Sequence, residues 1–157
     1  MARASIEVRD LVVRYGGVVA VRGVTFAVGA GEHVTLLGPS GCGKTTTLRA
    51  IAGLEKPASG EIRIGGEVVF GSSPSVNVPA ERRGLSMVFQ SYAIWPHMSV
   101  FDNVAYGLRV RKRPEAEVAT RVREALDLVQ LAELETRSAS ELSGGQLQRG
   151  ALARAFV

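Results

Sequence analysis

The sequence predicts an α/β fold in which a strand-rich first part is followed by a mostly helical second part. Three observations support this prediction. Long stretches with strand-like alternation come first, at residues 5–14 and 18–28. A glycine-rich loop then separates a short apolar run from the apolar stripe of a helix. After Pro96 the pattern becomes mostly helical.

Turn-forming residues separate the strands of the first part. Residues 5–14 and 18–28 are expected to be strands joined by a Gly-Gly turn. Residues 61–64 and 67–70 form a predicted hairpin around a second Gly-Gly turn. The segment 71–84 is rich in Ser, Pro and Gly, and it is therefore expected to be a loop.

Two short apolar runs are expected to form buried strands. They lie at residues 33–37 and 85–89, and the second ends at Gln90. Residues 45–54 carry the apolar stripe of a helix. Another helix is expected to open at Pro114, with one face formed by Val118, Val122, Ala125, Leu126 and Val129.

Composition narrows the class of protein. Among 157 residues 46% are hydrophobic, which allows a sizeable core, and the net charge of +4 is too diffuse to indicate nucleic-acid binding. The single cysteine, Cys42, excludes an intrachain disulfide and favours a reduced compartment. No apolar run approaches the roughly 18 residues that cross a bilayer, so the chain is not expected to span a membrane itself.

The glycine-rich loop fits the pattern G-x-x-x-x-G-K-[ST] at every fixed position. Its glycines allow the backbone N–H groups to wrap a phosphate, and the following helix adds its positive dipole end. Lys44 supplies a charge for the β- and γ-phosphates, and the Thr45 hydroxyl is placed for Mg²⁺. Cys42 is interpreted as a small filler rather than a nucleophile. The candidate ATP-binding residues of this loop are Gly38, Pro39, Ser40, Gly41, Cys42, Gly43, Lys44, Thr45 and Thr46.

A second motif lies about a hundred residues downstream. Its residues are Leu142, Ser143, Gly144, Gly145 and Gln146. Ser143 is a good N-cap, and the two glycines expose backbone N–H groups at a helix start, which favours a second anion site. An ordinary loop followed by a helix cap is the alternative interpretation of the motif taken alone.

Together the two motifs resemble the Walker A loop and the signature sequence of ABC ATPases. The resemblance covers essentially the whole chain. It implies a P-loop NTPase fold of the ABC ATPase type, with an N-terminal antiparallel β part and a helical subdomain. It divides the chain into a nucleotide-binding core at 1–90, a helical subdomain at 91–141, and the signature with the start of its helix at 142–157. Tyr15 would then stack on adenine, or it is an ordinary core or edge tyrosine. Gln90 matches the Q-loop glutamine that approaches Mg²⁺ and the attacking water.

The resemblance also implies partners. In this family two ATP-binding subunits pair head to tail, so the signature residues 142–146 would bind the ATP held by the other subunit. ATP and Mg²⁺ are the implied cofactors, with Thr45 and Gln90 at the metal. Integral membrane permease subunits are the implied partners, and no nucleic acid is expected. The subunit would lie peripherally at the cytoplasmic face of the inner or plasma membrane.

A permease would dock on the segment 90–107, where Trp95, Pro96 and Met98 provide an apolar surface. The alternative is that these side chains pack into the core of the subdomain. The sequence of this segment, and of residues 77–83 before it, is similar to the ATP-binding subunits of bacterial importers of ferric iron, polyamines and sugars. Among these importers, the resemblance is nearest to those of ferric iron.

No residue of the sequence matches the family's catalytic glutamate or switch histidine. We expect the chain to be truncated before the Walker B strand, since no apolar run is followed by Asp-Glu. A chain that ends there is expected to be marginally stable, because strands of a parallel sheet would lack neighbours. Two other functions remain open: a nucleotide-binding fragment without turnover, and a non-transport ABC ATPase that acts on DNA or ribosomes.

Overall fold

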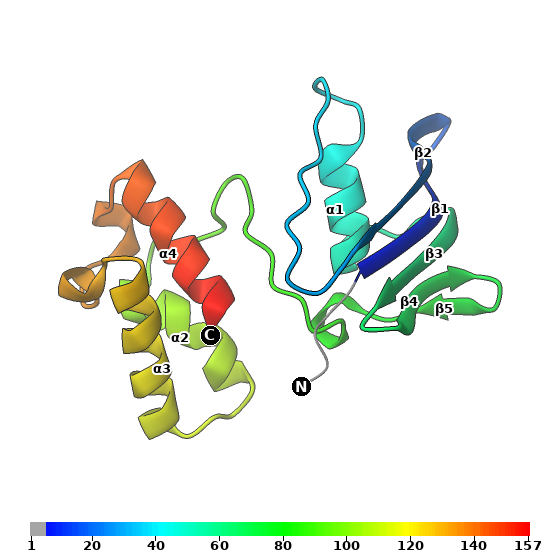
Figure 1. The fold of residues 1–157 in the computed structure, drawn as a ribbon. Coiled ribbons are helices and arrows are strands. Elements are labelled where there is room, and N and C mark those ends of the chain that lie inside the picture. The colour runs from blue at the N-terminus through cyan, green and yellow to red at the C-terminus, as the bar shows by residue number, and fades with distance from the viewer. Residues whose placement is uncertain (1–5) are drawn as a thin grey trace. The chain divides into compact units, whose positions relative to one another are not determined.

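The computed structural model describes residues 6–157, which form two compact units. The first unit extends to Leu85 and the second begins at Ser86. Figure 1 shows the strands in the first unit and most of the helices in the second. The strand-rich part followed by a helical part is therefore confirmed.

The first unit is built on an antiparallel sheet of five strands in the order β2-β1-β3-β4-β5 (Figure 1). Their bounds are Ile6–Tyr15 for β1, Val18–Val28 for β2, Ser59–Ile64 for β3, Glu67–Ser72 for β4 and Ser75–Asn77 for β5. The two predicted Gly-Gly turns are confirmed as the turns between β1 and β2 and between β3 and β4. Strand β5 lies in the segment predicted to be a loop. Its backbone pairs with the edge of β4, a contact that the polar composition of the segment does not reveal.

Helix α1, Lys44–Ala52, packs on this sheet. Ala50 and Ile51 of the helix join Val8, Leu11 and Val21 of the strands in one buried cluster. The helix ends at Gly53, whose φ of 82° is the left-handed conformation that closes many helices. The phosphate-loop motif is therefore attached to a helix that is fixed by its apolar face.

The two buried strands predicted at 33–37 and 85–89 are absent, and this part of the prediction was wrong. Val34 is 44% exposed, Leu37 88% and Val88 41%. A strand exists only where a neighbouring strand accepts its hydrogen bonds, and among residues 6–157 none lies alongside either segment. Apolar character alone identifies a candidate strand but not its partner.

The second unit contains helices α2, Val100–Val110, α3, Glu115–Leu128, and α4, Gly144–Phe156. Val104, Leu108, Val122 and Leu126 are at most 1% exposed in its core, and all the apolar residues predicted for the α3 face are buried. Single turns of 3₁₀ helix lie at Ala132–Leu134 and Ala139–Glu141 here, and at Ala80–Arg82 in the first unit. Within residues 6–157 no helix combines the length and the apolar character needed to cross a bilayer.

Replacing Gly150 with alanine is expected to stabilise the second unit by about 1 kcal/mol, because glycine in a helix interior is less favourable than alanine by that amount. An added Cβ would lie 3.9 Å from Leu131 Cδ1 and 4.0 Å from Ile94 Cδ1, which is ordinary van der Waals contact. Urea unfolding followed by far-UV circular dichroism measures the change. Gly107→Ala in α2 is the matched control, since its Cβ meets nothing within 4 Å and reports helix propensity alone. A loss of stability in Gly150→Ala would contradict the packing described here.

Candidate functional site

The glycine-rich loop leads directly into the N-terminus of α1. Gly43 is the N-cap, with φ 96°, and its carbonyl accepts hydrogen bonds from Thr47 N at 2.8 Å and Thr47 Oγ1 at 2.9 Å. A Cβ at Gly43 would lie 2.5 Å from the carbonyl oxygen of Ala20, so β2 leaves no room for a side chain there. The loop is therefore shaped by close backbone approach as well as by positive φ.

The lysine of the motif lies across its own loop. Lys44 Nζ donates to the carbonyl oxygens of Gly38 at 2.8 Å and Pro39 at 2.7 Å, and it is 3.5 Å from Cys42 Sγ. Cys42 is a free, exposed thiol. The ammonium group is thus held at the mouth of the loop by dipoles that a phosphate oxygen can replace.

The residues present suit a Mg²⁺-nucleotide. Thr45 is exposed in the first turn of α1, beside the N–H groups that begin the helix. Within residues 6–157 no cluster of His, Cys, Asp and Glu is placed to hold a metal ion by itself. Mg²⁺ typically takes one or two protein ligands and completes its shell with substrate phosphates and water, so a single hydroxyl beside the loop fits that mode.

Tyr15 ends β1 on the surface of the first unit. Its side chain is 47% exposed, and its hydroxyl donates to Glu55 Oε2 at 2.7 Å, just beyond the end of α1. This hydrogen bond raises the pKa of the Tyr15 phenol above its ordinary value, while the Thr46 hydroxyl acts in the opposite direction. The structure therefore places Tyr15 as an exposed aromatic near α1 rather than in the core. Stacking on adenine stays a prediction.

The second motif starts α4 with a complete capping box. Ser143 Oγ accepts from Gln146 N at 3.4 Å, and Gln146 Oε1 accepts from Ser143 N at 2.8 Å. Leu142, half-buried, packs against the core of the unit. The N-cap role predicted for Ser143 is confirmed.

Gly144 and Gly145 are not required by the packing of their own unit. Both are exposed, and a Cβ at either would meet nothing within 4 Å. Among residues 6–157 none accepts a hydrogen bond from their backbone N–H groups. The first N–H groups of any helix lack intrahelical acceptors, and glycine at these two positions leaves them uncovered.

Gln90 is exposed, and it opens the turn that follows residues 85–89. It belongs to the second unit, whereas the phosphate loop belongs to the first. Its approach to Mg²⁺ and water stays a prediction. Downstream of it Trp95 and Met98 are half-buried and Pro96 is exposed, so the segment contributes to both the surface and the packing of the unit.

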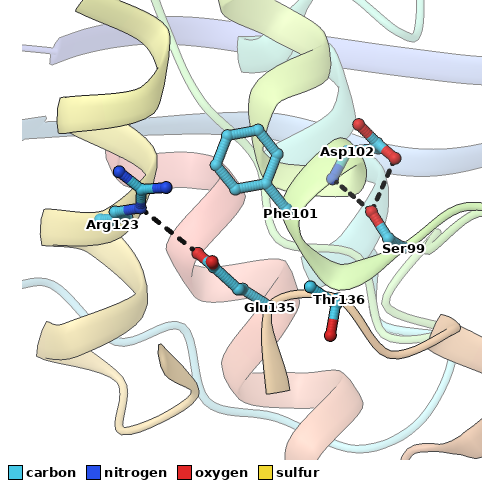
Figure 2. Close-up of a pocket in the computed structure, with 6 residues that line it drawn as sticks. All are labelled: Ser99, Phe101, Asp102, Arg123, Glu135 and Thr136. Carbon is cyan, nitrogen blue, oxygen red and sulfur yellow. Dashed lines mark hydrogen bonds and ion pairs between the residues drawn. The ribbon is translucent and has the colours of Figure 1, made fainter. Parts of the chain in front are cut away.

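A hollow of about 410 Å³ in the second unit does not form part of this site. Figure 2 shows its lining residues, Ser99, Phe101, Asp102, Arg123, Glu135 and Thr136. Its charged groups already have partners. Ser99 Oγ donates to Asp102 Oδ2 at 2.6 Å, and Arg123 pairs with Glu135 at 3.6 Å. The bond from Ser99, with Arg109 next, lowers the pKa of Asp102. Ser99 and Asp102 cap the start of α2, and Arg123 of α3 pairs with Glu135, so we assign this hollow no ligand.

A family model described as ABC transporter matches residues 21–157. This chain belongs to the ABC transporter family. The match spans both the phosphate loop and the second motif, the two segments that resemble the Walker A loop and the signature of this family. The fold is that of a P-loop NTPase of this family.

Curated relatives of this chain include ATP-binding proteins of importers. The spermidine/putrescine import ATP-binding protein PotA of Aggregatibacter actinomycetemcomitans is 51% identical over 97% of this chain and 39% of its own length. The trehalose/maltose import ATP-binding protein MalK of Thermococcus litoralis is 51% identical over 98% of this chain and 41% of its own. The Fe(3+) ions import ATP-binding protein FbpC 1 of Pectobacterium atrosepticum is 48% identical over 99% and 42%. The ABC ATPase chain described here therefore spans about two fifths of the length of these relatives, and they do not single out ferric iron.

Motif reasoning missed three residues that fix the end of α1 and the turn after Gln90. They are Arg83, Asn103 and Arg154, and each is a polar side chain that hydrogen-bonds to backbone carbonyls of another segment. The available signals were an arginine within the alanine-rich helix α4 and an arginine within the Ser-, Pro- and Gly-rich segment 71–84. Neither signal identifies the carbonyl groups that the arginine binds.

Proposed function

We propose that this chain binds Mg-ATP in its Walker A loop and forms the ATP-binding part of the motor of a solute importer. The observation that carries the proposal is the loop itself. Gly43 approaches Ala20 too closely for any side chain, and Lys44 lies across the loop on carbonyl partners that phosphate oxygens can replace.

The residues of the chain have distinct parts in binding. Backbone N–H groups of the loop and of the first turn of α1 bind the phosphates, and Lys44 exchanges its carbonyl partners for phosphate oxygens. Thr45 and Gln90 are the residues that would hold Mg²⁺, which neutralises phosphate charge when bound. Tyr15 offers an exposed ring for the adenine.

The signature is proposed to bind the ATP of a second ATP-binding subunit in a head-to-tail dimer. Gly144 and Gly145 present free N–H groups at the positive end of a 13-residue helix. Ser143 and Gln146 hold that helix end through the capping box, and Leu142 anchors it to the core. A γ-phosphate brought by a partner subunit suits these donors.

The proposed membrane partner docks beside the segment that follows Gln90. A hollow of about 180 Å³ within the second unit is lined by Ser91, Tyr92, Ile94, Pro96, Ala139, Ser140 and Leu147. Its lining combines apolar side chains with small hydroxyls, which suits a short helix of an integral membrane permease. The subunit would then lie peripherally at the cytoplasmic face of the membrane.

The cargo is proposed to be a small solute. The names of the relatives include polyamines, disaccharides and ferric iron at similar identity, so ferric iron has no advantage over the other two. The residues of this chain act on ATP, on a second subunit and on the permease. None of these roles depends on the chemistry of the cargo.

Binding of a fluorescent ATP analogue in the presence of Mg²⁺ tests the proposal. Lys44→Ala is expected to weaken binding by about tenfold to a hundredfold, because a charge-assisted hydrogen bond contributes about 1.5–3 kcal/mol. Lys56→Ala is the matched control, since Lys56 is an exposed lysine outside the loop. Equal affinities in the two variants, or no binding by the unaltered chain, would refute the proposed function.

A further inference from the structure

The last turn of α4 is joined to the turn that follows Gln90. Arg154 Nη1 donates to the carbonyl of Ala93 at 2.6 Å, and Nη2 donates to the carbonyl of Tyr92 at 2.9 Å. The same guanidinium lies over the ring of Trp95, 5.0 Å from its centroid. One side chain therefore contacts three residues of the turn, Tyr92, Ala93 and Trp95.

The turn has a conformation that needs support. Tyr92 has φ 61° and Ala93 has φ 48°, in the left-handed region that residues with a Cβ seldom adopt. Two successive residues in this region persist where the surroundings determine the backbone. The two carbonyls that Arg154 binds belong to these two residues.

The other end of the turn is held by α2. Asn103, 2% exposed, accepts from Trp95 N at 2.9 Å and donates to Trp95 O at 3.0 Å. The Trp95 ring packs on Tyr106, with 4.5 Å between the ring centroids. Asn103 thus fixes the turn to the core, and Arg154 is its link to α4.

A guanidinium is an unusual choice if the position serves only to fill space. Burial lowers the pKa of Arg154, which shows that desolvation disfavours its charge. No carboxylate among residues 6–157 forms an ion pair with it, and its bonds go to backbone carbonyls. An apolar side chain would pack there without this desolvation but would leave both carbonyls unbound.

We infer that Arg154 is a positioning residue that fastens the turn Ser91–Trp95 to α4, so that the turn and the signature at the other end of the same helix move together. Helix α4 runs from Gly144 to Phe156, so the link spans nearly its whole length. The fastening itself is independent of the proposed function. Its use, to transmit permease docking to the signature, rests on that function.

Trp95 is the only tryptophan of the chain, so its fluorescence reports directly on the turn. In Arg154→Met the acrylamide quenching constant of Trp95 is expected to rise at least twofold. The variant lacks the guanidinium that lies over the ring and the two hydrogen bonds that hold the turn. Arg154→Lys retains a cation but cannot bind both carbonyls in the same way, and an intermediate rise is expected. Arg121→Met is the matched control, since Arg121 pairs with Glu117 on α3.

Far-UV circular dichroism establishes that each variant retains its helices. A folded Arg154→Met chain with the unaltered quenching constant would overturn the inference. If Arg154→Met does not fold, Arg154→Lys decides the matter: a rise in quenching supports the fastening, and an unchanged constant refutes it.

A second measurement tests the transmission. Mg-ATP is added at a protein concentration at which two chains pair, so that the ATP held by one chain reaches the signature of the other. Occupancy is followed with a fluorescent ATP analogue, and the change in Trp95 emission is compared between the unaltered chain and Arg154→Met. At equal occupancy the change is expected to be at least threefold smaller in the variant. Equal changes, or no change in the unaltered chain despite occupancy, would refute transmission. Absence of occupancy would refute the proposed function and leave the quenching result standing.

Discussion

Replacing Gly43 with alanine is expected to lower the affinity for Mg-ATP by more than a hundredfold. The added Cβ would lie 2.5 Å from the Ala20 carbonyl oxygen and 3.1 Å from Val21 Cγ2, both on strand β2. Neither the backbone atom nor the buried valine can move away easily, and φ is 96°. The start of α1 must therefore shift, and the N–H groups and Lys44 lose the positions from which they bind phosphate.

The same titration with a fluorescent ATP analogue measures this effect. Gly31→Ala is the matched control, because Gly31 also has positive φ, 78°, but a Cβ there meets nothing within 4 Å. Its affinity is expected to stay within about threefold of the unaltered chain, since the backbone strain falls outside the loop. Tight binding by a folded Gly43→Ala chain would show that the contact with β2 does not shape the loop.

Replacing Arg83 with methionine is expected to destabilise the first unit by about 3 kcal/mol. Arg83 is 4% exposed, and its guanidinium donates to the carbonyls of Ala50 at 2.8 Å, Ile51 at 3.0 Å and Val78 at 2.8 Å. Two of these carbonyls belong to the last turn of α1, where a cation is also favoured by the helix dipole. Methionine fills similar space but leaves these buried acceptors without a donor.

Urea unfolding combined with amide hydrogen exchange in α1 tests this expectation. Arg63→Met is the matched control, because Arg63 pairs with Glu61 at 2.7 Å on the surface of the same sheet. Exposed pairs contribute up to about 1 kcal/mol, so a small change is expected there. Similar losses in the two variants would mean that Arg83 does not anchor the end of α1.

Local signals explain which elements the sequence predicted well. The alternation in β1 and β2, the glycine turns, the helix α1 and the cap at Ser143 depend on residues close in sequence, and the structure shows each of them. The phosphate loop and the signature were recognised for the same reason. Their chemistry needs particular residue types at fixed spacing.

Long-range pairing explains what the sequence did not predict. Residues 33–37 have the apolar character of a strand, but a strand also needs a neighbour, which spacing cannot supply. Residues 75–77 look like a polar loop, yet they pair with β4. Arg83 and Arg154 bind carbonyls that lie 33 and 61 residues away in the chain, and no local pattern connects such partners.

The hydrogen bonds of Lys44 determine which ligands can interact favourably with its ammonium group. Its ammonium group already has two carbonyl partners, from Gly38 and Pro39, before any ligand arrives. The free energy that a ligand gains from Lys44 is the difference between two interactions: that of the ammonium group with the ligand's acceptors, and that with the two carbonyls it already binds. Adenosine brings no competing charge, whereas a triphosphate brings several anionic oxygens to one place. We therefore expect the loop, whose shape depends on Gly43, to favour nucleotides with several phosphate charges, because only these offer Lys44 better acceptors than its two carbonyl partners.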